Sequence, residues 1–240
     1  FVTCSLLFHA PLPEASAAAG DITAVKTQSE GNNLEYDTDS GTHNSLVQVD
    51  SDTYALAYGN QQDDDGFIAT FTISSDGTTI TEVGSLEHDT DYGTHNSLVQ
   101  VDSDTYALAY SGPGFDGFIS TFTISSDGTT ITKVASLEHD TDYGVRNSLV
   151  QVDSDTYALA YAGADSDGFI STFTIDSDGT ITAVKTQSEG NNLEHDTDTG
   201  GHNSLVQVDS DTYALAYAGA DNDGFISTFT IDSDGTITAV

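Results

Sequence analysis

Short runs of alternating bulky and small residues, separated by polar turns, recur along the whole chain. The run SLVQV at Ser45–Val49 is followed by the turn DSDT and then by YALAY at Tyr54–Tyr58. After a Gly/Asp loop come F-I-[AS]-T-F-T-I, the tight turn Asp76-Gly77 and the run T-I-T-x-V. Alternation with a period of two predicts strands, and Asp-Gly between such runs favours a hairpin. Runs with a helical period are absent, so the sequence predicts an all-β fold.

This four-strand pattern is repeated four times. The serine of the motif N-S-L-V-Q-V-D-S-D-T-Y-A-L-A-Y lies at Ser45, Ser97, Ser148 and Ser204, so the copies start 52, 51 and 56 residues apart. Self-similarity at a fixed period of this size indicates a repeat architecture. We therefore assign residues 21–240 to one repeat domain.

The two faces of each predicted sheet differ in bulk. Tyr54, Leu56 and Tyr58 share one face of their strand, whereas Ala55 and Ala57 share the other. Both faces are fit for burial, and stacking of a bulky face on a flatter one is typical of sheets arranged around an axis. The pattern predicts a β-propeller or propeller-like array of four-stranded antiparallel blades, each of about 52 residues.

The repeated meander resembles the blades of β-propeller proteins, and among them the repeat proteins exported by environmental microbes. The loops Gly163–Phe169 (GADSDGF) and Asp221–Phe225 (DNDGF) are similar to the calcium loops of integrin-α FG-GAP blades, although the later ligands of that loop are absent. The resemblance implies a secreted propeller with calcium-binding loops.

The charge balance is extreme. The sequence has 39 acidic residues against four basic ones (Lys26, Lys133, Arg146 and Lys185), which gives a formal charge of −35. Nucleic acid and anionic membranes are therefore excluded as partners. The 11 Phe and 11 Tyr residues, with regular Val, Leu and Ile, supply a core and argue against disorder.

The first 20 residues differ in kind from the rest. An apolar stretch is followed by Ala15-Ser16-Ala17 and Ala17-Ala18-Ala19, which fit a small-x-small cleavage site. We interpret residues 1–20 as a signal-peptide remnant or tail, and we expect a secreted or cell-surface protein. Cys4 is the sole cysteine, and nothing elsewhere approaches the roughly 18 apolar residues of a membrane span.

The loop between repeats carries the densest polar motif, E-[HY]-D-T-D-x-G-x-[HR]-N. Carboxylates at alternate positions before a glycine are typical of calcium loops, although the same residues also form ordinary turns. The candidate Ca²⁺ ligands are Asp37, Asp39, Asp89, Asp91, Asp140, Asp142, Asp196 and Asp198.

Other candidate groups are interpreted as structural. Six histidines lie in the same loop: His43, His88, His95, His139, His195 and His202. Because duplication spreads equivalent groups around a ring, whereas a catalytic site needs one singular constellation, we assign no catalytic or cofactor-binding residue. The tyrosine pairs, such as Tyr54 and Tyr58, lie in mid-strand and are expected in the core.

The function expected from the sequence is non-catalytic: an exported protein that presents repeated loops multivalently to an extracellular protein or carbohydrate, for adhesion or ligand binding. One alternative is a structural or filament-forming array. The segment Asp21–Lys26 has the sequence of a fourth strand without a blade of its own. Either it mediates self-association by strand donation, or the native array is longer than these four repeats. A third alternative is a propeller enzyme such as a glycosidase or lyase, whose site residues would be unique to one blade.

The first prediction concerns calcium. If the Asp loops bind Ca²⁺ only in the folded state, millimolar Ca²⁺ will raise the melting temperature by mass action. The control is Na⁺ at matched ionic strength, because screening alone would stabilise a chain of −35 charge. Equal shifts in the two salts would remove the metal-site hypothesis.

Overall fold

Each repeat folds into one four-stranded antiparallel sheet, a blade, as the alternation predicted. The computed structural model of the chain describes residues 34–38, 40–60, 64–183 and 192–239. Blade 1 comprises β1 (Gly41–Gln48), β2 (Thr53–Asn60), β3 (Gly66–Ile73) and β4 (Ile80–Asp89). Blade 2 comprises β5 (Thr94–Gln100), β6 (Thr105–Ser111), β7 (Gly117–Ile124) and β8 (Ile131–Asp140).

The second half of the array repeats this order. Blade 3 comprises β9 (Val145–Gln151), β10 (Thr156–Ala162), β11 (Gly168–Ile175) and a fourth strand in two pieces, β12 (Ile181–Ala183) and β13 (Asn192–Asp196). Blade 4 comprises β14 (Gly201–Gln207), β15 (Thr212–Ala218), β16 (Gly224–Ile231) and β17 (Ile237–Ala239). Short 3-10 turns join the middle strands of the last three blades: η2 (Pro113–Phe115), η3 (Ala164–Ser166) and η5 (Ala220–Asn222).

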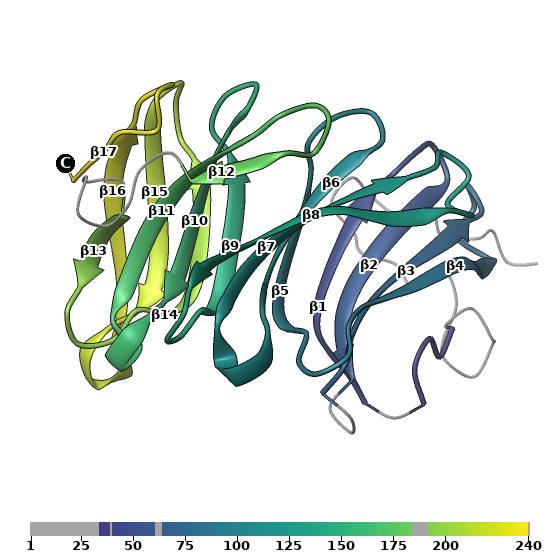
Figure 1. Ribbon diagram of the computed structural model, residues 1–240, viewed down its shortest axis with the longest axis horizontal. Helices are drawn as coiled ribbons and strands as arrows, with labels where there is room; N and C mark the ends of the chain where they lie inside the picture. Colours follow the sequence, from purple (N-terminus) through teal and green to yellow (C-terminus); the bar gives the residue numbers. More distant parts are fainter. Residues whose placement is uncertain (1–33, 39, 61–63, 184–191, 240) are drawn as a thin grey trace, which may run out of the picture.

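The blades stand side by side around a common inner edge. Neighbouring strands in each sheet follow chain order, and the first strands β1, β5, β9 and β14 pack in succession. Figure 1 shows blade 4 and blade 1 at opposite ends of the array. These features confirm the all-β, propeller-type fold class.

The fourth strand runs further than the sequence motif indicated. Glu87 and Asp89, assigned above to the loop between repeats, belong to β4 and pair with Phe67 and Gly66 of β3. The loop prediction was therefore wrong at its start. The turn itself is confined to residues 90–93, because the backbone of the preceding segment is used by the sheet.

In blade 3 the described part of the fourth edge consists of two strands, β12 and β13. β12 pairs with Phe173–Ile175 and β13 pairs with Gly168–Ser171 of the same strand. The spacing of 56 residues between the last two repeats is thus compatible with pairing of both pieces to β11. The inner strands keep their register.

The core consists of three equivalent layers between blades. At the interface of blades 2 and 3, Ala107 and Ile119 of one sheet pack against Tyr157, Tyr161 and Phe173 of the next. The same combination recurs between blades 1 and 2 and between blades 3 and 4. The prediction of one bulky and one small face is confirmed. The prediction of tyrosines in the core is confirmed for seven of the eight strand tyrosines, whereas Tyr54 of blade 1 is only half-buried. Burying one such large side chain contributes about 1.5–3 kcal/mol.

Side-chain hydrogen bonds also link consecutive blades. The hydroxyls of Thr70 and Thr121 donate to the turn carbonyls of Gly128 and Gly179, each at 2.6 Å, and Thr172 donates to Gly235 at 2.7 Å. Near the inner edge, the backbone N–H groups of Leu98, Leu149 and Leu205 donate to Ser45, Ser97 and Ser148 of the preceding blade, each at 2.9 Å. Four near-identical repeats thus make three near-identical junctions.

A histidine from each of the first three blades packs into the following junction; His88 is buried, and His139 and His195 are partly buried. The rings of His88, His139 and His195 pack edge-on against Tyr110, Tyr161 and Tyr217 at 4.7–4.8 Å. None of their ring nitrogens has a hydrogen-bond partner among the described residues. Burial lowers the pKa of His88 and of His139 to about 3 and that of His195 to about 4, so all three are neutral at pH 7.

Two segments with sequence-based interpretations, the leader at residues 1–20 and the strand Asp21–Lys26, lie outside the described residues. In the part of the chain that is described, no helix has the length and apolarity needed to cross a membrane.

The second prediction is an acid-sensitive fold. The folded-state pKa values of these histidines are depressed, so their stabilising effect is fully present above the unfolded value of 6.5 and is lost as the pH falls towards 3–4. For each histidine whose folded-state pKa is about 3, the free energy of unfolding will be lower at pH 5 than at pH 7 by roughly 2 kcal/mol. Denaturant unfolding at both pH values measures this difference.

The variant His139→Tyr isolates one of these groups, because Tyr36 occupies the equivalent place against blade 1, at 4.9 Å from Tyr58. It will lose roughly 2 kcal/mol less than the parent between pH 7 and pH 5. Equal losses in the two proteins would show that the acid sensitivity has another origin.

Candidate functional site

All four inner strands carry the same β-bulge near their start. In blade 1, Thr42 pairs with Gly59 but Ser45 pairs with Ala57, so the inner strand has one extra residue at this point. The same irregularity recurs in the other three blades. The residue in the bulge has a left-handed backbone in every case, with φ of 53° at His43, 54° at His95, 59° at Arg146 and 54° at His202. Bulges of this kind redirect side chains and are frequent beside active sites.

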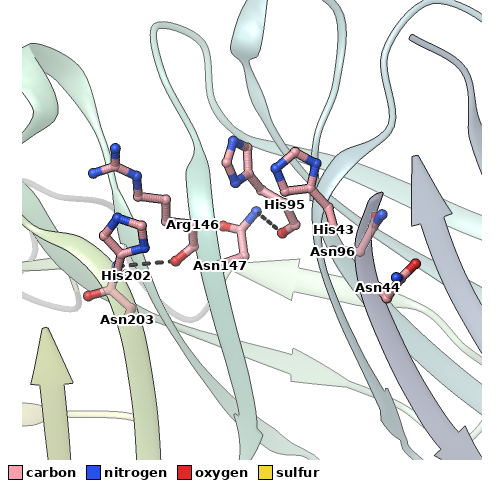
Figure 2. A pocket seen from close by; sticks show the side chains of 8 residues that line it. All are labelled: His43, Asn44, His95, Asn96, Arg146, Asn147, His202 and Asn203. Carbon is pink, nitrogen blue, oxygen red and sulfur yellow. Dashed lines mark hydrogen bonds between the residues drawn. The ribbon is translucent and has the colours of Figure 1, made fainter. Parts of the chain in front are cut away.

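The redirected side chains converge on one cavity at the inner edge of the array (Figure 2). It has a volume of about 270 Å³ and receives one residue pair from each blade: His43 and Asn44, His95 and Asn96, Arg146 and Asn147, His202 and Asn203. We call this the axial cavity. The rings of His43 and His95, from different blades, lie 4.2 Å apart.

Arg146 makes the cavity asymmetric. It is the single arginine of the sequence, and it stands where the other three copies have histidine. A Cβ atom at position 201 would overlap Arg146 Nη1. Thr42, Thr94 and Val145 occupy the positions equivalent to Gly201 in the other copies, so the glycine leaves room for the guanidinium.

The asparagines hold the bulges in place. Asn147 Nδ2 donates to the carbonyl of His95 at 3.1 Å, and Asn203 Nδ2 donates to that of Arg146 at 3.2 Å (Figure 2). Asn96 Nδ2 donates to the carbonyl of Gly93 at 3.1 Å. The Oδ1 atoms of these three asparagines are buried and have no hydrogen-bond partner among the described residues.

Burial and neighbouring cations determine the protonation state of the cavity. Burial lowers the pKa of His95 to about 4, with smaller contributions from His43, Arg146 and His202, and burial also lowers the pKa of His43. His95 is therefore a neutral imidazole at pH 7, while Arg146 keeps its charge. The cavity therefore combines a proton acceptor and a fixed cation.

The predicted calcium ligands lie elsewhere: Asp89, Asp140 and Asp196 are the last residues of β4, β8 and β13, and Asp91, Asp142 and Asp198 lie in the turns that follow. Asp89 Oδ1 accepts hydrogen bonds from the backbone N–H groups of Asp91 and Tyr92 at 3.1 and 3.2 Å, and Asp140 and Asp196 do the same in their own turns. Asp142 lines a surface hollow of about 640 Å³ together with Asp165 of the loop Gly163–Phe169. Asp39 lies outside the described residues.

Among residues 34–38, 40–60, 64–183 and 192–239, no three His, Cys, Asp or Glu side chains converge in a way that could hold a metal ion. The calcium site stays a prediction.

Sequence reasoning missed the axial cavity because it treated six histidines as one group. The structure separates them into two sets, seven residues apart in each repeat: His88, His139 and His195 in the junctions, and His43, His95 and His202 on the axis. A usable signal was present in the sequence. Arg146 and Gly201 break an otherwise regular repeat, and both departures lie at this cavity.

No family model matches the chain, and no curated protein sequence matches it. Solved structures do match in fold. A putative 6-phosphogluconolactonase from Bacteroides uniformis superposes with a TM-score of 0.61 at 14% identity, over 84% of this chain and 54% of that protein. An α-L-arabinofuranosidase, Arb93A from Fusarium graminearum, gives a TM-score of 0.53 at 12% identity, over 84% and 65%.

Sqt1 of Saccharomyces cerevisiae gives a TM-score of 0.54 at 12% identity, over 82% of this chain and 46% of that one. The chain thus spans about half the length of the lactonase and of Sqt1. At these identities the likeness establishes the fold alone.

These findings correct the expectation of a non-catalytic adhesion or binding protein, together with the assignment of the chain as not an enzyme. Two of the three superposed structures are named as enzymes. The physical premise was also wrong. The equivalent residues of the four repeats are not kept apart around a ring, because the bulges bring them to one cavity. Arg146 differs from the three histidines at the equivalent positions, so the cavity is not made of four identical groups. The chain is a β-propeller-type protein whose structural neighbours include enzymes.

Proposed function

We propose that the chain is a propeller enzyme that hydrolyses a small anionic sugar lactone in the axial cavity. The observation that carries this proposal is the presence of a neutral imidazole, His95, and a permanent cation, Arg146, in one cavity. A lactone hydrolase needs one base to activate water and a positive group to hold the substrate or the developing oxyanion.

In the proposed reaction, His95 accepts a proton from water as the water oxygen bonds to the lactone carbonyl carbon. The ring C–O bond then breaks, and the same imidazole returns the proton to the departing alkoxide, so the product is the open hydroxy acid. Arg146 pairs with the phosphate or carboxylate of the sugar.

The size and lining of the cavity favour this reaction over the other enzyme classes considered. A volume of about 270 Å³ suits a single sugar ring. A glycosidase of the usual kind needs two opposed carboxylates, and none of the eight residues that line the cavity is acidic. The fold likeness to a putative 6-phosphogluconolactonase supports the same choice.

Export and calcium binding remain part of this proposal. The leader-like residues 1–20 and the FG-GAP-like loops favour an extracellular enzyme with Ca²⁺ on its turns. Mass spectrometry of secreted protein tests the first point, because a mature N-terminus still at Phe1 contradicts cleavage.

The third prediction concerns catalysis. With 6-phosphogluconolactone, the protein will release protons faster than spontaneous hydrolysis, and His95→Gln will lower kcat by about 100-fold or more. Arg146→Gln will raise KM for this substrate by about tenfold or more while leaving the neutral gluconolactone unaffected, because only the phosphate pairs with the guanidinium.

Lys133→Gln is the matched control, since it removes one positive charge from a blade edge outside the axial cavity. An equal loss in this variant, or no turnover of either lactone, would contradict the proposal. If a uronate instead gives an unsaturated product that depends on His95 and Arg146, the reaction is a lyase elimination.

The fourth prediction concerns salt. A chain of formal charge −35 repels an anionic substrate at long range, and salt screens this repulsion. The value of kcat/KM for the phosphorylated lactone will therefore rise between roughly 0.01 and 0.2 M NaCl, where the Debye length falls from about 30 Å to below 10 Å. The neutral lactone serves as the control, and a parallel rise for both substrates would mean that salt acts on the protein.

A further inference from the structure

Three aromatic side chains that depart from the repeat lie together in the middle of the array. Tyr92 and Tyr143 occupy the same position in the turns before β5 and β9, where the other two copies have Ser40 and Thr199. Phe115 lies in η2, between β6 and β7. Its ring is 4.9 Å from that of Tyr92 and 5.9 Å from that of Tyr143, so it joins the two turns. We call these three residues the aromatic strip.

The ring of Phe115 is not needed for the fold of its own turn. The residue at this position has a left-handed backbone in every blade, with φ of 63° at Asp64, 72° at Phe115, 70° at Ser166 and 60° at Asn222. Its carbonyl accepts a hydrogen bond from the following turn at 2.9 Å in Asp64, 2.8 Å in Phe115 and 2.9 Å in Ser166. Short polar side chains tolerate this backbone better than a bulky one does. Phenylalanine therefore costs blade 2 some stability without serving the turn.

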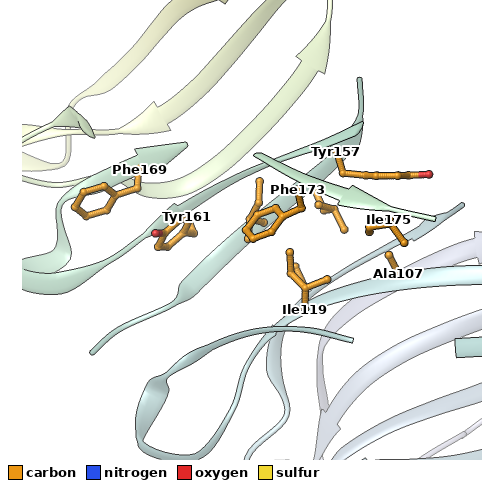
Figure 3. Packing of buried hydrophobic residues seen from close by; sticks show 10 residues of the cluster. Ala107, Ile119, Tyr157, Tyr161, Phe169, Phe173 and Ile175 are labelled. Atoms are coloured by element: carbon orange, nitrogen blue, oxygen red, sulfur yellow. The ribbon is translucent and has the colours of Figure 1, made fainter. Parts of the chain in front are cut away.

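The aromatic strip also lies outside the layers between blades. The aromatic residues of a junction, such as Tyr157 and Phe173, are buried against the neighbouring sheet (Figure 3). Phe115 is 45% exposed, Tyr92 and Tyr143 are half-buried, and the core clusters of the described residues include none of the three. Three rings gathered at the surface of so acidic a chain mark an interaction site.

The strip continues into a hollow of the surface. Tyr143 lines the hollow of about 640 Å³ that lies between the turn after β8 and η3, together with Asp142, Ala164, Asp165 and Ser166. The carboxylate and hydroxyl oxygens are hydrogen-bond acceptors, and the ring of Tyr143 is apolar surface. An aromatic wall with a few polar groups beside it is typical of a small-molecule site.

Charge and ring geometry select the class of ligand. A formal charge of −35 disfavours an anion. An organic cation binds over ring faces that surround it, but Phe115 and Tyr92 meet edge-on at an interplanar angle of 70° and pack on each other. A neutral sugar with equatorial hydroxyls, as in β-linked glucose, fits both features of the site. Its C–H faces pack on aromatic rings, and its hydroxyls donate to carboxylates.

We propose that the aromatic strip and the hollow bind a neutral oligosaccharide of β-linked glucose. One sugar ring stacks on Tyr143 in the hollow and donates hydrogen bonds to Asp142 and Asp165. The sugar chain continues over Phe115 towards Tyr92.

The proposed site is close to the axial cavity along the chain. Tyr92 and Tyr143 precede His95 and Arg146 of the cavity by three residues. Binding at the strip would hold the protein on a polysaccharide with the cavity beside it. This inference does not depend on which reaction the cavity carries.

Isothermal titration calorimetry with cellohexaose tests the proposal. In roughly 0.2 M NaCl, which screens the charge of the chain, the parent will bind this neutral hexamer with a dissociation constant below about 1 mM. Phe115→Asn and Tyr143→Thr will each weaken binding by about tenfold or more, because each removes one ring of the strip. Asn222 and Thr199 already occupy these positions in other copies, so both variants will fold. Phe115→Asn will melt at no lower temperature than the parent, since asparagine tolerates the left-handed backbone.

Three further variants are matched controls. Phe115→Tyr keeps an aromatic face and will bind cellohexaose within about threefold of the parent. Val134→Thr removes an exposed apolar side chain outside the strip and will bind like the parent. Arg146→Gln changes the axial cavity and will also bind like the parent.

Several outcomes would overturn the proposal. The parent could fail to bind cellohexaose, or folded Phe115→Asn and Tyr143→Thr could bind it as tightly as the parent. Loss of binding in Arg146→Gln would mean that the sugar occupies the axial cavity. Tetramethylammonium that binds more tightly than cellohexaose, and depends on Phe115, would make the strip a cation site.

Discussion

The packing of one bulky sheet face on one small sheet face is the interaction on which this protein depends. Tyr, Leu and Phe from one blade cover Ala and Ile of the blade before it, and this occurs three times with nearly the same residues. Because a sheet with two apolar faces is not stable alone, no blade is an independent unit. The position of every turn, bulge and edge follows from this stacking.

Much of the architecture was predictable because it is encoded locally and repeated. The alternation in YALAY and the Asp-Gly turns identified strands, hairpins and the two kinds of face. The length of β4 was not predictable, since Glu87 and His88 look like loop residues until a neighbouring blade buries His88. Blade 3 shows the same limit, because β12 and β13 both pair with β11 although this repeat is longer than the others.

The candidate site could not be predicted from the motif because its geometry arises between repeats. A left-handed residue in a bulge has no distinct signature when it is histidine or arginine, and convergence of four such residues requires the curvature of the whole array. Arg146 and Gly201 were visible as departures from the repeat. Their meaning depended on the contact between adjacent blades, which brings the guanidinium over the glycine.

The bulge also separates the residues that line the axial cavity from the residues that hold the blades together. Residues 43, 95, 146 and 202 lie outside the ladder pairing of their strands, and their side chains are not part of the layers between blades. Substitution there changes the chemistry of the axis, as the arginine in one copy illustrates, where Gly201 of the next blade leaves room for the larger side chain. Duplication of such a repeat therefore multiplies positions that are free to diverge, while the stacking residues keep every copy foldable. A lineage that begins with identical blades can in this way acquire an asymmetric centre one residue at a time.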